Sequence, residues 1–324
     1  MSGGEADDRR DAGISLIATL LDEKATLGEW WRSIMAQTRP PREIVVVDGG
    51  SRDGTPGILR EMAEEAPFPV RIHEEPGCNI ARGRNRAIEL ASHRVIAVTD
   101  GGCVLHKRWL ENLVRPMLDD PEINLVAGFY QPLEGDWFQG LSACATLPLP
   151  WEVRAGRFMP SSRSIAFRRE VWEEVGGYPE WLDIGEDMYF NHAWKVSGIS
   201  FATAKGALAY WRMRKDLAGL LKQYFLYARG DGESGMYPQR HAIRFSAYGW
   251  LVLAAFSWRG FLEPTLVAAS LYSGRRWLRV PFYMRNETPL RQAAAYAALP
   301  PLLAAIDGAK MAGYICGLLG GRRR

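Results

Sequence analysis

Short, continuous apolar runs separated by amphipathic stretches fill the N-terminal part of the chain. Residues 13–21, 43–47 and 94–99 are such runs, and their β-branched content is typical of strands buried on both faces. Between them, residues 25–38 and 56–65 repeat apolar side chains at helical spacing. Strands that alternate with helices predict an α/β fold with a doubly wound, mostly parallel sheet and right-handed crossovers.

The same alternation continues through residue 196. Further strands are expected at 70–73, 124–131 and 161–167, and further helices at 85–92, 109–118, 169–175 and 186–196. Residues 132–160 are rich in aromatic residues and proline, and no regular element is assigned to them. The predicted α/β domain spans residues 13–239. It follows a polar segment, residues 1–12, that is expected to be disordered and has no apolar core of a secretory signal.

Two of the buried strands end in an aspartate that two glycines follow, at Asp48 and at Asp100. Because open α/β sheets bind ligands at the carboxyl edge of their strands, this pair predicts a nucleotide or metal–diphosphate site. Each aspartate taken alone is also typical of a turn. The chain has neither the P-loop sequence nor the glycine fingerprint of dinucleotide-binding folds.

The C-terminal part combines positive charge with apolar runs. Residues 205–324 hold 18 Lys and Arg against 6 Asp and Glu, a net charge of +12, whereas residues 1–204 carry −9. This asymmetry predicts an anionic partner. The apolar stretches between the basic residues, without a known nucleic-acid-binding motif, favour a membrane over nucleic acid. The apolar runs are residues 246–258, 264–274, 292–306 and 311–319, with Arg275, Arg276 and residues 322–324 beside them.

None of these runs reaches the roughly 18 residues that a spanning helix needs. Residues 240–324 are therefore predicted to form amphipathic or hydrophobic helices that hold the protein peripherally on an anionic membrane surface, at the cytoplasmic face of the cell membrane. A soluble helical subdomain with its own core is the alternative. Four cysteines without metal-binding spacing indicate a reducing compartment and no structural metal.

An ordered set of motifs resembles the family 2 glycosyltransferases, which have the GT-A fold. The opening strand, the Val-Asp-Gly-Gly-Ser motif at Asp48 and the Ala-Arg-Gly-Arg-Asn-Arg-Ala segment at 81–87 come first. Asp100 lies where the family has its D-x-D motif, and Glu186-Asp187 where it has its catalytic Glu-Asp pair. The motifs cover residues 13–230, and the tail resembles those of membrane-associated bacterial members.

The resemblance implies an inverting transfer of a sugar from a nucleotide-sugar donor to a hydroxyl of a saccharide or lipid-linked acceptor, in polysaccharide biosynthesis. It makes Asp187 the general base with Glu186 beside it, and places Asp100 at a Mg²⁺ or Mn²⁺ ion on the donor's diphosphate. Asp48 would accept hydrogen bonds from the nucleoside. The other donor-binding residues that it implies are Thr19, Leu21, Glu23, Asn79, Arg84, Arg214 and Arg229.

The chain departs from the family pattern in places. Gly102 replaces the second aspartate of D-x-D, which would weaken the metal site, and the first strand lacks the family's aromatic residue. His106 could help to hold the metal, although a histidine on a loop is usually solvated. A nucleotidyltransferase and a non-catalytic membrane scaffold remain as alternatives. The first would need a glycine-rich first loop, and residues 19–27 contain no glycine.

Overall fold

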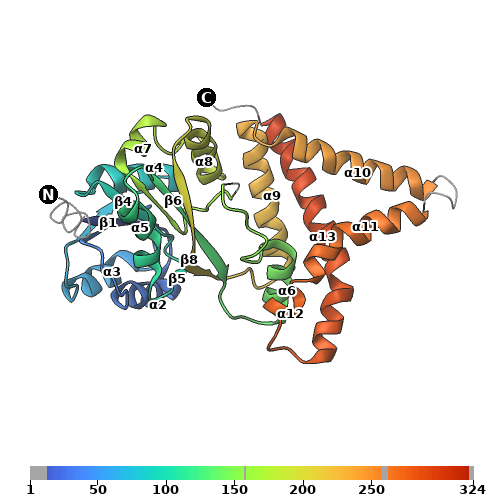
Figure 1. The fold of residues 1–324 in the computed structure, drawn as a ribbon, viewed down its shortest axis with the longest axis horizontal. Coiled ribbons are helices and arrows are strands. Elements are labelled where there is room, and N and C mark those ends of the chain that lie inside the picture. The colour runs from blue at the N-terminus through green and yellow to red at the C-terminus, as the bar shows by residue number, and fades with distance from the viewer. Residues whose placement is uncertain (1–12, 157, 257–261, 321–324) are drawn as a thin grey trace. The chain divides into compact units, whose positions relative to one another are not determined.

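The computed structural model describes residues 13–156, 158–256 and 262–320 (Figure 1). The chain divides into two compact units. The first consists of residues up to 133 together with 150–211, and the second of residues 134–149 together with those from 212 onward. This division lies earlier in the chain than the predicted boundary at residue 240. The predicted disordered segment 1–12 and the terminal arginines 322–324 lie outside the described residues.

The first unit is built on one eight-stranded sheet in the order β3-β2-β1-β4-β7-β6-β8-β5. Strands β3, β2, β1 and β4 pair in parallel, as the apolar runs predict, and β6 also pairs in parallel with β8. The pairings β4–β7, β6–β7 and β5–β8 are antiparallel, so the second half of the sheet is mixed. The strands are β1 (Ile14–Leu20), β2 (Glu43–Asp48), β3 (Val70–Glu74), β4 (Val95–Val98), β5 (Cys103–Leu105), β6 (Leu125–Pro132), β7 (Ile165–Arg168) and β8 (Phe201–Trp211).

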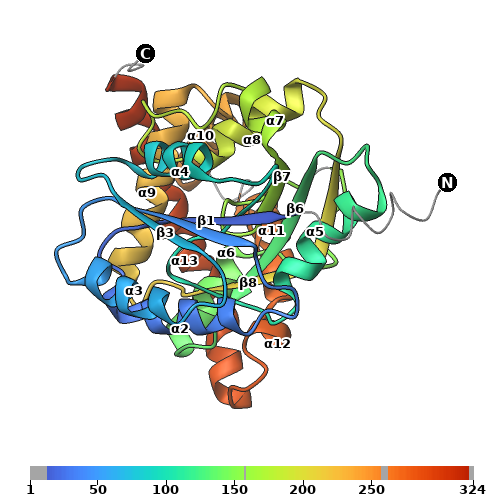
Figure 2. The same cartoon turned by 90° about the vertical axis from the view of Figure 1, so that its left-hand side faces the viewer.

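Helices cover both faces of this sheet (Figure 2). Alternate residues of β1 explain why: Leu16 and Ala18 pack with α2 and α5 on one face, whereas Ile17 packs with α4 on the other. A strand covered on both sides has no polar face, which is the reason for its continuous apolar run. The helices of this unit are α2 (Lys24–Met35), α3 (Thr55–Glu64), α4 (Ile80–Leu90), α5 (Trp109–Asp119), α7 (Arg169–Glu174) and α8 (Glu186–Val196).

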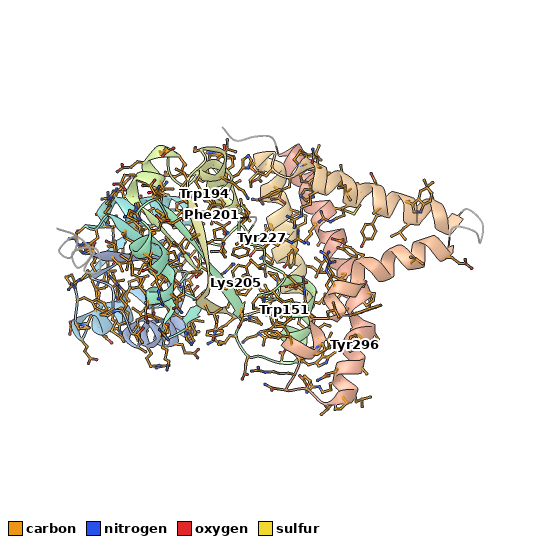
Figure 3. All side chains as sticks on the ribbon, in the orientation of Figure 1. Trp151, Trp194, Phe201, Lys205, Tyr227 and Tyr296 are labelled. Atoms are coloured by element: carbon orange, nitrogen blue, oxygen red, sulfur yellow. The ribbon has the colours of Figure 1, made fainter. Side chains whose placement is uncertain are left out.

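The longest strand, β8, has no counterpart in the sequence prediction. Lys205 and Gly206 interrupt its apolar pattern, and both residue types are depleted in strands. The Lys205 ammonium donates to the Val153 carbonyl at 2.9 Å, which satisfies the charge at the strand. Nearby, the Phe201 ring meets Trp194 of α8 edge to face, with ring centroids 4.9 Å apart (Figure 3). Contacts with residues distant in sequence, rather than local strand propensity, therefore stabilise this strand.

Within the described residues of the second unit, all regular elements are helices. Its core joins Leu141 of α6, Leu220 of α9, Met284 and, from α13, Leu299 and Leu303. The helix α6 lies inside the passage to which no element was assigned. Its N-terminus is a capping box, in which Asp136 and Gln139 bond each other's backbone N–H. The helices are α6 (Trp137–Thr146), α9 (Leu217–Ser234), α10 (Pro238–Phe256), α11 (Leu262–Trp277), α12 (Val280–Tyr283) and α13 (Pro289–Leu319).

The last helix, α13, joins two of the predicted apolar runs into one element of 31 residues. By length and composition it could cross a membrane, the only helix of the described part that meets this test. The core helix of a soluble protein meets the same test, and α13 contributes four leucine and isoleucine side chains to the core of its own unit. The structure thus replaces two short runs by one long helix with a buried side.

Candidate active site

The second strand ends in a turn that its own aspartate holds together. Asp48 is fully buried. Its Oδ1 accepts from the backbone N–H groups of Gly50 at 2.9 Å and Ser51 at 2.7 Å, and its Oδ2 accepts from the Ser51 hydroxyl at 2.6 Å. Gly50 has a φ of +98°, and a Cβ there would lie 3.0 Å from the Pro76 Cα, so the turn requires glycine. Asp48 thus shapes this loop, and its contact with a nucleoside stays a prediction.

A cavity of about 420 Å³ lies beside this turn, at the carboxyl edge of the parallel strands. Its lining brings together five of the predicted donor-binding residues, Thr19, Leu21, Glu23, Asn79 and Asp100. They come from the ends of β1 and β4 and from the residue before α4. Parallel strands present their carboxyl ends at one edge, which is why residues so far apart in sequence meet here.

Arg84 links the cavity to the predicted catalytic pair. It lies on α4, is 2% exposed, and donates from Nη2 to Asp100 Oδ1 at 2.8 Å and from Nη1 to Glu186 Oε1 at 2.5 Å. This helix begins five residues earlier than predicted, because the Asn79 side chain caps it by accepting from the Arg82 N–H. The sequence predicted Arg84 as a donor-binding residue, which stays a prediction, and did not predict its contact with Glu186.

A second path leads from Asp100 to Asp187, the neighbour of Glu186. The Ser161 hydroxyl donates to Asp187 Oδ2 at 3.2 Å and accepts from Arg163 Nη1 at 3.0 Å. The Nε of Arg163 lies 3.5 Å from Asp100 Oδ2. Arg84 on one side and Ser161 with Arg163 on the other therefore complete a ring between Asp100 and the adjacent Glu186 and Asp187, which we call the carboxylate–arginine ring.

The two central members of the ring have shifted proton affinities. Burial raises the pKa of Glu186 above its ordinary range, against the opposing effect of Arg84, and the charge of Asp187 raises it further. Burial alone would lower the pKa of Arg84, but the charges of Asp100 and Glu186 raise it by more, so Arg84 remains a cation. A fixed buried cation next to the cavity is suited to hold an anionic group.

The side chains at the cavity suit a divalent cation that arrives with a diphosphate. The described residues contain no group of three or more His, Cys, Asp or Glu that could hold a metal ion. Asp100 and Glu23 nevertheless line one cavity, and Mg²⁺ typically takes one or two carboxylates together with phosphate oxygens. A Cβ built at Gly102 would lie 3.6 Å from both carboxylate oxygens of Glu23. Glu23 thus reaches the region where a second D-x-D aspartate would begin.

The remaining predicted residues lie elsewhere. Arg214 donates to Gln223 Oε1 at 3.0 Å and Arg229 pairs with Glu233 at 2.9 Å, both within the second unit, so their role at the diphosphate stays a prediction. His106 Nδ1 accepts from the Arg108 N–H at 3.3 Å, as a loop histidine does. Ser161 and Arg163 were not predicted as site residues. They lie just after the unassigned passage, in the strand that was predicted at 161–167 but begins only at Ile165, and outside any recognisable motif.

Comparison with known proteins identifies the family of this chain. Residues 15–173 match the family model described as glycosyl transferase family 2. This chain belongs to that family. The matched region contains β1, the Asp48 turn, Arg84 and Asp100, and it ends before Glu186 and Asp187. The chain is therefore a glycosyltransferase, as the motifs predicted.

The relatives and the solved structure to which this glycosyltransferase is similar come from prokaryotes. It is 26% identical over 249 residues to Glycosyltransferase AglE of Haloferax volcanii, covering 75% of this chain and 81% of the relative. It is 25% identical over 168 residues to the glucosyl-dolichyl phosphate glucuronosyltransferase of the same organism, covering 49% of this chain and only 52% of that relative. The fold matches the mannosyltransferase PcManGT from Pyrobaculum calidifontis, solved with GDP-Man and Mn²⁺, with a TM-score of 0.58, 19% identity and coverage of 98% and 93%. This likeness confirms the GT-A fold.

Proposed function

We propose that this glycosyltransferase moves a sugar from a nucleotide-sugar donor to a hydroxyl of a saccharide or lipid-linked acceptor, with inversion at the anomeric carbon. The observation that carries the proposal is the carboxylate–arginine ring. It holds the donor-side Asp100 and the acceptor-side Asp187 in one rigid unit next to a cavity of suitable size. Positioning two reacting groups in this way removes much of the entropic cost of the transfer.

The donor's diphosphate would lie against Asp100, in the cavity that Thr19, Leu21 and Asn79 also line. A Mg²⁺ or Mn²⁺ ion held by Asp100, with Glu23 as a second carboxylate, would neutralise the leaving nucleoside diphosphate. Arg84 and Arg163 already contact Asp100 and would add positive charge there. This second source of charge suits a chain that has Gly102 in place of an aspartate.

Asp187 would take the proton of the acceptor hydroxyl while its oxygen attacks the anomeric carbon in line. The bond between that carbon and the diphosphate oxygen breaks, and the nucleoside diphosphate leaves. Ser161 and the Met188 N–H each donate to a different oxygen of Asp187, which fixes the carboxylate's orientation. Glu186 is a positioning residue, because it holds Arg84 rather than facing the cavity.

The deciding experiment incubates the full chain with a panel of sugar nucleotides and candidate acceptors and measures the released phosphate species. Release of a nucleoside diphosphate that depends on the acceptor supports the glycosyltransferase mechanism. Release of pyrophosphate would instead identify a nucleotidyltransferase. Nucleotide binding without release of either, across the whole panel, would indicate the non-catalytic scaffold.

We also propose that the second unit holds the enzyme on an anionic membrane surface, at the cytoplasmic face. Support comes from exposed apolar side chains on α10, where Trp250 is 50%, Val252 57% and Leu253 63% exposed. Arg240, exposed on the same helix, adds the positive charge that anionic headgroups attract. A lipid-linked acceptor would be reached most readily from this position.

A further inference from the structure

A buried charged network crosses the second unit where α10, α11 and α13 meet. The Asp307 carboxylate of α13 accepts from Arg244 Nε at 2.9 Å, from the Tyr272 hydroxyl at 2.7 Å and from the Tyr248 hydroxyl at 3.3 Å. Asp307 is 2% exposed. Three helices thus fix one carboxylate, and the donors around it are all on α10 and α11.

This carboxylate is outnumbered by cations. Arg240, Arg244 and Arg276 all lie close enough to Lys310, one turn beyond Asp307, to act on its charge. Arg244 pairs with Asp307 at 2.9 Å, and Arg276 and Lys310 add two further cations, whereas Arg240 is exposed and the nearby Asp231 is held by His241 at 2.9 Å. A buried excess of one sign of charge is costly unless a counter-ion neutralises it.

Two of these cations have donor groups without a hydrogen-bond partner among the described residues. The Lys310 ammonium lies 4.6 Å from the Tyr224 ring centroid, and it has no hydrogen bond or ion pair among the contacts of the described residues. Burial lowers its pKa to about 8, and the neighbouring arginines lower it against the effect of Asp307. The Nε of Arg276 is buried without a hydrogen-bond partner, although its Nη1 donates to the Tyr272 carbonyl. Both groups are donors that an anion could satisfy.

The two helices that carry this charge become apolar along their length. On α10 the cations occupy residues 240–244, and the exposed apolar side chains follow at residues 250–253. On α11 the order is reversed, with Val267, 59% exposed, preceding Tyr272 and Arg276. Helices α10 and α11 contact each other and converge at their apolar ends (Figure 1). Farther from those ends, Asp307 of α13 bridges Arg244 of α10 and Tyr272 of α11. An anion that carries a hydrocarbon chain fits this distribution better than a free anion.

We propose that Arg244, Arg276 and Lys310 form a binding site for the phosphate group of a membrane lipid, whose hydrocarbon chains lie along the apolar parts of α10 and α11. The site rests on the proposed membrane association and gives it a specific ligand chemistry. Guanidinium and ammonium groups pair with phosphate oxygens by charge-assisted hydrogen bonds. The buried Nε of Arg276 and the unpaired ammonium of Lys310 are the donors that such a phosphate would use.

The test measures binding of the full chain to vesicles of phosphatidylcholine alone and of phosphatidylcholine with phosphatidic acid, in high salt so that diffuse attraction is screened. We expect binding to require phosphatidic acid, and Arg276→Gln and Lys310→Gln each to weaken it about 10-fold, which corresponds to ~1.4 kcal/mol. Arg275→Gln is the matched control. It removes the same charge one residue away, from a side chain that is exposed, and should change binding less than about twofold.

Several outcomes would contradict the proposed lipid-phosphate site. Equal losses of vesicle binding in Arg275→Gln and Arg276→Gln would show that the basic residues act only by general charge attraction. Equal binding to both vesicle types would show that only apolar contact holds the protein on the membrane. Calorimetric binding of inorganic phosphate, abolished by the same substitutions, would assign the site to a free anion. If wild type and all variants bind acidic vesicles equally, the site is wrong but membrane association stands. If wild type binds no vesicle in high salt but floats with acidic vesicles in low salt, the site is wrong and membrane association stands. If it binds no vesicle at either salt concentration, the site and membrane association are both wrong. Thermal unfolding of each variant identifies any loss that comes from misfolding.

Discussion

Asp187 is the side chain on which the proposed reaction depends most directly. Asp187→Asn keeps the shape of the side chain but cannot take a proton, and its single amide oxygen can accept from only one of the Ser161 hydroxyl and the Met188 N–H. We expect kcat to fall by about 10²–10⁴-fold, because general-base catalysis contributes this much, while donor affinity stays unchanged. Turnover by nucleoside diphosphate release and donor binding by calorimetry measure the two effects separately.

The control for this prediction is Glu186→Gln. It removes one of the two carboxylates that fix Arg84, so it should weaken donor binding as well as turnover. A kcat in Asp187→Asn equal to that of wild type would remove Asp187 from the mechanism, whatever the effect at Glu186.

Substitution of Gly102 by aspartate tests whether the proposed metal site binds weakly because it lacks a second D-x-D carboxylate. A side chain there has room, since the nearest atoms to a new Cβ are those of Glu23 at 3.6–3.9 Å. We expect Gly102→Asp to tighten Mn²⁺ binding in the presence of a nucleoside diphosphate about 10-fold, a change that electron paramagnetic resonance of the ion detects. Gly102→Asn, which matches the shape without the charge, should not.

The same logic gives a rescue experiment. Glu23→Gln should weaken Mn²⁺ binding, and adding Gly102→Asp to it should restore the affinity. If Glu23→Gln leaves the ion's affinity unchanged, Glu23 is only part of the cavity lining, as the sequence motif originally implied.

At the residue scale, sequence reasoning found the site's members better than their contacts. Strand-end patterns predicted Asp48 and Asp100 at the sheet edge, because that position follows from the apolar run before each, whereas the other cavity residues were implied only by the resemblance to the family. The hydrogen bonds by which Asp48 holds its own turn were not predicted. Arg163 was not found, because its meeting with Asp100 depends on how β7 and the preceding segment return to β4.

At the scale of elements, the parallel half of the sheet was predictable and the antiparallel half less so. Strands β1, β2 and β4 are covered on both faces, which imposes a continuous apolar run that the sequence displays. The strand β8 carries polar and small residues in its middle, and only pairing with β6 and β5 makes it a strand. The helix α6 was not predicted. Its capping box is the clearest sequence signal for it, because the aromatic residues and prolines of the passage obscure the helical spacing of apolar side chains.

The packing of α9 against α13 depends on glycines, which gives a prediction for the element. A Cβ at Gly313 would lie 2.1 Å from the Phe225 carbonyl oxygen, and one at Gly317 would lie 2.2 Å from that of Arg229. The two helix backbones must therefore separate to admit a methyl group. We expect Gly313→Ala to lower the free energy of unfolding by about 1–3 kcal/mol, as overpacking does, measured by denaturant unfolding.

Gly308 is the matched control on the same helix. No atom lies within 4 Å of a Cβ built there, so Gly308→Ala should raise the free energy of unfolding by about 0.5–1 kcal/mol through backbone entropy alone. A stabilising effect at both positions would show that α9 and α13 do not pack closely in solution.

At the scale of the whole molecule, the charge asymmetry follows the two units. The cavity and the family match, except for residues 134–149 of that match, belong to the first unit, whereas the basic network and the exposed apolar side chains of α10 belong to the second. The predicted boundary at residue 240 rested on where apolar runs begin. A boundary drawn in this way leaves α6 and α9 in the first domain. They belong to the second unit because they pack against α13, through Leu141, Leu220 and Leu302. A chain cut at residue 240 would expose these side chains and should aggregate.

The full chain is expected to associate with an anionic membrane surface without crossing it. Flotation with vesicles that contain phosphatidylglycerol should recover the protein at low salt and less of it at high salt, since the basic side chains contribute roughly 1 kcal/mol each and salt screens them. Recovery that is independent of both lipid charge and salt would indicate purely apolar insertion, whereas no recovery under any of these conditions would favour the alternative of a soluble helical subdomain.

The helix α13 has the length to span a bilayer, but its surroundings argue against it. One side contributes to the core with α6 and α9, and another places Asp307 and Lys310 in the charged network with α10 and α11. A charge near the bilayer centre costs at least about 2.5 kcal/mol, and crossing would also require these contacts to break. We therefore expect protease added outside sealed vesicles to digest residues 289–319 together with the rest of the chain, with detergent-opened vesicles as the control. A protected fragment of roughly 20 residues, the length of a spanning helix, would show that α13 leaves its unit and crosses.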